Sequence, residues 1–269
     1  MISLRTVVQV LGTIPFLFTT LLAQTLSLPK DVSVKDNGPR TYRFVVDYHN
    51  ANTRGEIVSR QRITGEYTRG FPGGDVVWNN VTSATANGAS DPYPAAEKRT
   101  FMEGFRYRNA LQDTMKPDFF KNFPPTAVME RNLVWDTGMF EMFGQAYLTQ
   151  LKLNEPYRIL SNQSIDMPGV GSFTNKNVVL TWTGNSQMHG QDCAVIEYRA
   201  FFNPLDINNG GVLLKGRSNY WGLIWVSLAT RQIEYATLYE DVLGELTLPG
   251  QNMQVMDVVR TGTFEPVTK

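Results

Sequence analysis

The sequence predicts a mainly β protein of the α+β class: a strongly curved antiparallel sheet, like half of a barrel, with one substantial helix packed against its concave face. Three observations indicate this fold. Hydrophobic residues alternate along most of the chain, turn residues recur at intervals that suit a meander, and one central stretch has helical periodicity. A two-layer β-sandwich with the helix at one edge is the alternative.

The first 23 residues have the pattern of a secretory signal peptide. Arg5 precedes an uncharged run, residues 7–23, which ends in the small residue Ala23. Pro15 within the run and the polar residues after it disfavour a stable spanning helix. Bacterial lipoproteins carry a cysteine at the cleavage point, whereas the single cysteine, Cys193, lies far along the chain. We therefore expect residues 1–23 to be cleaved, leaving a secreted or periplasmic protein without a lipid anchor or a stable membrane span.

The composition of residues 24–269 restricts the partners and the architecture. Removing Arg5 from 25 basic residues leaves 24, against 25 acidic ones, so the mature chain is nearly neutral. A nucleic-acid partner would require a basic excess. One cysteine excludes internal disulfides, and Cys193 begins an apolar segment that predicts burial. No linker divides residues 24–269, so we expect a single β-rich domain.

The first predicted strand shows the alternation most clearly, with Tyr42, Phe44, Val46 and Tyr48 on one face. The polar run 56–69 follows, and its charges predict a solvent-facing or edge strand. Further strands are expected through residues 76–78 and 101–107.

The periodicity changes at residues 133–151, where one helix is predicted. Its apolar positions fall at helical spacings on one side and include Trp135, Met139 and Phe143. This arc is wide enough to predict that most of the helix is buried against the sheet. Gly138 and Gly144 weaken the helix, and we expect them to allow a strand to approach closely.

Strands return in the C-terminal half, at residues 178–183, 194–202, 212–228, 233–239, 242–248 and 255–259. The segment 219–226 is the most informative of them, because both of its faces are apolar. Tyr220, Ile224 and Val226 alternate with a second apolar set made of Trp221, Leu223 and Trp225. Such a strand is expected to be covered on both sides, by protein or by a bound apolar ligand.

Catalytic signatures are scarce. The chain has two histidines and lacks zinc, nucleotide and nucleophile-elbow motifs, so neither a metal nor a cofactor is expected. A glycosidase requires only two facing carboxylates. The candidates also have ordinary structural explanations, because Asp136 would lie in the first helical turn and Glu240 at a strand end. The candidate acids are Asp136, Glu141, Glu240, Asp241 and Glu245.

The leading functional hypothesis is a secreted or periplasmic, non-enzymatic binding protein that holds an apolar or amphiphilic, lipid-like molecule within the curved sheet. The architecture resembles that of periplasmic half-barrel carriers of lipids and lipoproteins, and the resemblance assigns no residue. A carbohydrate-active hydrolase with a carboxylate pair and a cell-envelope structural or protein-interaction module are the alternatives. The candidate ligand-lining residues are Trp221, Leu223, Trp225, Met139, Met142 and Phe143.

Overall fold

The computed structural model describes residues 27–30, 34, 38–108, 111–114, 116, 118–167, 170–209 and 211–267. The predicted signal peptide, residues 1–23, lies outside the described residues. The strands are β1 (Arg40–Asn52), β2 (Ile57–Arg69), β3 (Asp75–Asn87), β4 (Glu97–Lys98), β5 (Phe105–Arg108), β6 (Tyr157–Met167), β7 (Gly171–Met188), β8 (Gln191–Asn209), β9 (Val212–Ser227), β10 (Ile233–Thr247) and β11 (Gln254–Pro266). The helices are α1 (Leu111–Thr114) and α2 (Val128–Glu141), with short helical turns η1 (Thr100–Met102), η2 (Met142–Ala146) and η3 (Leu148–Gln150).

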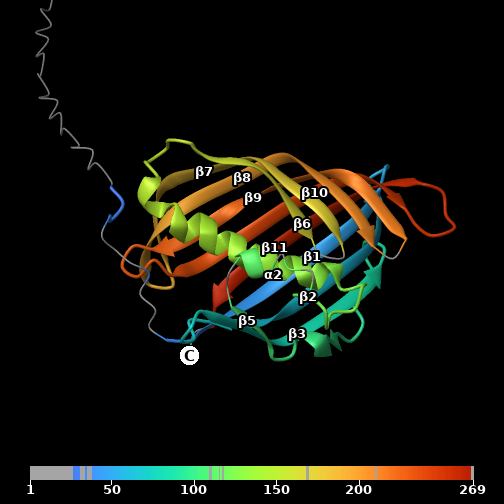
Figure 1. The fold of residues 1–269 in the computed structure, drawn as a ribbon, viewed down its shortest axis with the longest axis horizontal. Helices are drawn as coiled ribbons and strands as arrows, with labels where there is room; N and C mark the ends of the chain where they lie inside the picture. Colours follow the sequence, from blue (N-terminus) through green and yellow to red (C-terminus); the bar gives the residue numbers. More distant parts are fainter. Residues whose placement is uncertain are drawn as a thin grey trace, which may run out of the picture.

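All the strands belong to one eleven-stranded antiparallel sheet in the order β4-β3-β2-β1-β11-β10-β9-β8-β7-β6, with β5 pairing to β3. Two meanders, β1 to β3 and β6 to β11, are joined where β1 pairs with β11. The sheet curves strongly and α2 crosses its concave face diagonally (Figure 1). The predicted half-barrel with one helix is therefore confirmed, and the β-sandwich alternative is wrong.

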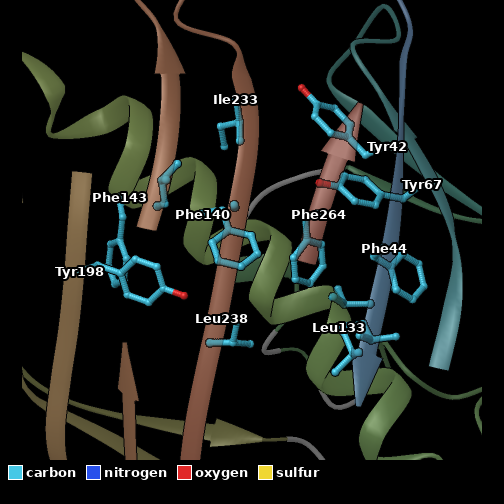
Figure 2. Packing of buried hydrophobic residues seen from close by; sticks show 14 of the residues in the cluster. Tyr42, Phe44, Tyr67, Leu133, Phe140, Phe143, Tyr198, Ile233, Leu238 and Phe264 are labelled. Atoms are coloured by element: carbon cyan, nitrogen blue, oxygen red, sulfur yellow. The ribbon is translucent and has the colours of Figure 1, made fainter. Parts of the chain in front are cut away.

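Alternation in β1 determines which residues form the core. Tyr42, Phe44, Val46 and Tyr48 are at most 2% exposed, while Arg43 between them points to solvent. Phe140 of α2 packs on this inner face, with its ring centroid 4.7 Å from that of Phe264 on β11 (Figure 2). The concavity beneath α2 is thus a solid core.

The helix begins earlier than predicted, and a different set of its side chains faces the sheet. It begins at Val128 rather than at residue 133, after Ala127, which provides no side-chain cap. Helical turns continue to Gln150, near the predicted end. Trp135 and Met139, expected to be buried, are only half-buried, and the face on the sheet includes the polar residues Asp136 and Thr137.

The close approach of strand β9 to the helical region explains one of its two glycines. A Cβ atom on Gly144 would lie 3.2 Å from Ile224 and 3.1 Å from Val226, so β9 packs tightly there. A Cβ atom on Gly138 would meet nothing within 4 Å. The expectation of a close strand thus holds for Gly144 and fails for Gly138.

Two strand predictions also require correction. β2 is not an edge strand, because β1 and β3 flank it. Its residues Arg60, Arg62 and Glu66 lie on the outer face, whereas Ile63 and Tyr67 are buried on the inner face and Arg69 pairs there with Glu141. β10 runs without interruption through Glu240 and Asp241, which were expected at a strand end. Cys193 is buried, as predicted.

Candidate functional site

The six predicted lining residues do not form one site, because the sheet separates them. Trp221, Leu223 and Trp225 alternate with the buried Tyr220, Ile224 and Val226, so they lie on the outer face of β9, opposite α2. Met139, Met142 and Phe143 lie on the helical segment inside the sheet.

The three helical residues differ in accessibility. Phe143 is 1% exposed and packs against Tyr198, with ring centroids 5.6 Å apart, so it belongs to the core. Met139 and Met142 are half-buried and pack only partly against the core. Only these two of the predicted set are accessible on the inner side.

A second group of accessible apolar residues lies on the concave face, toward the turns that join β6 to β7, β8 to β9 and β10 to β11. Directly paired residues in adjacent strands share a face, and the pairs Phe173–Leu205, Ile207–Leu214 and Leu214–Leu246 form such a surface. Phe173 also contacts the buried ring of Tyr220, which places this surface on the inner side. We call it the inner apolar strip; its half-buried members are Ile165, Phe173, Leu205, Ile207, Leu214, Leu246, Met256 and Val258.

A buried charged cluster borders the strip. Arg260 on β11 donates from Nη1 to Asp136 Oδ2 at 2.8 Å and from Nη2 to Asp136 Oδ1 at 3.1 Å. Its Nη2 also lies 2.7 Å from Glu240 Oε2, and the Ser218 hydroxyl donates to Glu240 Oε1 at 2.5 Å. Glu240 is paired with Arg260, which follows Val258 of the strip by two residues on the same strand face, and the Glu240 side chain is 13% exposed. The charged cluster therefore forms the polar end of the strip.

Ion pairs with arginines fix α2 along its length. Besides Asp136, Glu130 lies 2.9 Å from Arg99 and Glu141 lies 2.9 Å from Arg69. Because each acid of these pairs is largely buried, its arginine compensates a desolvation cost that would otherwise oppose docking of the helix.

Burial has a measurable consequence at Asp136. Desolvation raises the pKa of this carboxyl to about 6, against the opposing effect of Arg260 and with a further contribution from Glu240. A carboxyl with a raised pKa in the folded state stays protonated while the unfolded chain ionises, so its contribution to stability is lost as pH rises from about 4 to about 6. The free energy of unfolding of the unchanged protein minus that of Asp136→Asn is expected to fall by about 3 kcal/mol across this pH range. Urea denaturation of both proteins at several pH values measures this difference. A difference independent of pH would contradict this assignment.

The outer face of the sheet carries exposed aromatic residues. Phe201 on β8, Trp221 on β9 and Tyr239 on β10 are 38%, 40% and 44% exposed. Their rings are in contact across the three strands, with centroids 6.4 Å apart for Phe201 and Trp221 and 6.0 Å for Trp221 and Tyr239. We call these residues the outer aromatic row. The sequence predicts that this face of β9 is covered by protein or by an apolar ligand. In the part of the chain that the structure describes, no protein layer covers Trp221, whereas Leu223 and Trp225 are half-buried.

A polar cleft of about 390 Å³ lies at the other end of the strands, beside the turns that join β7 to β8 and β9 to β10. Its lining includes His189, Gln191 and the pair formed by Arg40 with Glu234, in which Arg40 Nη1 donates to Glu234 Oε1 at 3.0 Å. The Ser186 hydroxyl donates to the carbonyl of Gln187. It is therefore not engaged as a donor to His189, and a serine–histidine pair is not formed.

The structure places the candidate acids in different environments. Asp136 and Glu240 meet, but both bind Arg260, and Glu141 binds Arg69. Asp241 and Glu245 lie on the outer face of β10, where partial burial and the Asp241 carboxylate raise the pKa of neighbouring Asp257 to about 6. Among the described residues, no three of the histidine, cysteine and acidic side chains are grouped closely enough to hold a metal ion.

Sequence reasoning missed Arg260 and the part that Glu240 plays. Arg260 lies on the same strand face as Val258 and Phe264. A cation in an otherwise apolar alternating face could have been noticed in the sequence, because a buried cation requires a buried acidic partner. Glu240 was hidden by the expected strand break. The inner apolar strip was missed because its residues are dispersed over six strands.

Comparisons with known proteins leave the family open. No protein-family model and no curated protein matches the chain. A solved structure of a DUF1329 family protein from Desulfovibrio piger covers 86% of this chain and 87% of its own, with 9% identity and a TM-score of 0.15. This similarity is too low to support an argument about fold or function. In the described part of the chain, no helix has the length and hydropathy needed to cross a membrane.

Proposed function

We propose that the protein is a secreted or periplasmic, non-enzymatic binding protein that holds an apolar or amphiphilic molecule on the inner apolar strip. The observation that carries the proposal is that eight apolar side chains on a concave face are only partly buried. A concave apolar surface with a few polar groups at one end is typical of ligand sites.

The location of the strip distinguishes it from the core. Beneath α2 the concavity is filled by side chains such as Phe140 and Phe143, so a ligand has no room there. Beyond the helix, the strip remains partly accessible and Met139 lies on the accessible side of α2. Fully burying an apolar side chain contributes about 1.5–3 kcal/mol, and these side chains are already partly buried, so a ligand that covers one of them gains up to about 1 kcal/mol and a ligand that covers several gains more.

The polar end of the strip favours an amphiphile over a purely apolar ligand. Glu240 is partly exposed where the strip meets the charged cluster, and its carboxylate can accept a hydrogen bond from a ligand head group. The apolar part of the ligand would then extend over Val258, Leu214 and Phe173.

Adjacent leucines on β9 provide a matched test. Leu214 belongs to the strip, whereas Leu213 is 41% exposed on the outer face. With a dansyl-labelled undecanol as the probe, whose hydroxyl can donate to Glu240, Leu214→Asp is expected to weaken binding by about tenfold or more, because the apolar chain would contact a charge. Leu213→Asp is expected to bind as the unchanged protein does. Fluorescence titration measures both.

Two outcomes would contradict the proposal. The first is an absence of probe binding by the unchanged protein, combined with native mass spectrometry that detects no co-purified apolar molecule. The second is equal weakening by both aspartates. The proposed location is tested separately, by cell fractionation and N-terminal sequencing of the exported protein, where a mature start at Gln24 is expected.

A further inference from the structure

The outer aromatic row has a geometry that suits a ligand other than an amphiphile. Trp221 and Tyr239 face each other across paired strands with their ring planes 15° apart, and Phe201 continues the line onto β8. Adjacent strands are about 4.8 Å apart, so the three rings form a narrow row across the sheet rather than a broad patch.

Polar groups flank the row. Arg199 is paired directly with Trp221 and is exposed. Asn219 and Asp241 are paired with each other on the side of the row that faces the β8–β9 and β10–β11 turns. The flanking groups thus include a guanidinium, an amide and a carboxylate, which together can donate and accept hydrogen bonds around the exposed rings.

We propose that the outer aromatic row binds a neutral, extended oligosaccharide. A sugar ring has an apolar C–H face, which packs against an aromatic ring, and hydroxyl groups at its edge, which bond to flanking polar side chains. Arg199 on one side is opposed in charge by Asp241 and its neighbour Asp257 on the other, so the flanking groups do not select a strongly charged ligand. This inference is independent of the function proposed for the inner strip, which lies on the other face of the sheet.

The curvature of the sheet disfavours other occupants. The row lies on the convex side, opposite α2 (Figure 1). Two convex faces meet over a small area, whereas a standard interface buries about 800 Å² on each partner, so a second copy would be poorly held. A membrane surface would have to desolvate Asp241 beside the rings, which is unfavourable.

The test measures the binding of cellohexaose, chitohexaose and mannohexaose by isothermal titration calorimetry with the full mature chain. At least one hexasaccharide is expected to bind, and Tyr239→Ala and Trp221→Ala are each expected to weaken that binding by about tenfold or more. Leu243→Ala is the matched control, since Leu243 is 56% exposed on the same face of β10 outside the row. It is expected to leave the affinity unchanged.

Several results would overturn the inference. One is an absence of binding to all three sugars, and another is binding that Leu243→Ala weakens as much as Tyr239→Ala does. Self-association that is lost in Trp221→Ala, measured by analytical ultracentrifugation without sugar, would assign the row to a second copy instead. Circular dichroism of each variant shows whether the sheet is retained, and Tyr239→Ala decides the test if Trp221→Ala fails to fold.

Discussion

Replacing Arg260 with methionine is expected to lower the free energy of unfolding by about 3–5 kcal/mol, because it leaves two buried carboxylates without their cation. Asp136 loses two hydrogen bonds and Glu240 loses its ion pair. The side chains of all three residues are at most 13% exposed, so water cannot replace Arg260 fully. Urea denaturation at neutral pH measures the change.

Removing the acids together with the arginine provides the control. If the loss arises from uncompensated charge, the triple substitution Arg260→Met, Asp136→Leu and Glu240→Met should recover most of the stability, since an apolar replacement of a buried ion cluster is often neutral. A triple variant as unstable as Arg260→Met alone would show that the shape of the cluster matters more than its charge balance.

Phe140→Ala is expected to destabilise the fold by about 3–5 kcal/mol through the cavity it leaves between α2 and the sheet. Phe140 is 1% exposed and contacts both Phe264 and Tyr198. Phe201→Ala makes the same chemical change at a residue that is 38% exposed, and is expected to cost less than about half as much. Chemical denaturation of both variants tests the comparison, and equal losses would contradict the placement of Phe140 in the core.

Local patterns were sufficient to predict the architecture. Alternation in β1 identified its inner face correctly, and the change of period near residue 133 identified the helix. The start of the helix was placed too late because Ala127 lacks a capping side chain and because Glu130 and Arg131, although charged, are buried. Ion pairing across the sheet depends on the tertiary structure, so periodicity alone could not anticipate this burial.

The candidate site was harder to predict than the fold. Both faces of β9 read as apolar, and alternation cannot tell which face is concave, so Trp221, Leu223 and Trp225 were assigned to the wrong side of the sheet. Met139 lies on the inner side and is half-buried, and its role as a lining residue stays a prediction, whereas Phe143 is part of the core. The inner apolar strip depends on strand register across six strands, and register is not encoded in any one segment.

The pairing of β1 with β11 also constrains how the chain reaches its final form. Tyr42 pairs with Pro266, 224 positions later, and the core contact between Phe44 and Phe264 spans 220 positions. The sheet therefore cannot be completed until the last strand has been synthesised, and one side of β1 stays unpaired until then. Contacts so distant in sequence slow folding. A nascent chain of this protein thus keeps one edge of β1 unpaired until synthesis is nearly finished, which exposes that edge to chaperones, proteases and aggregation.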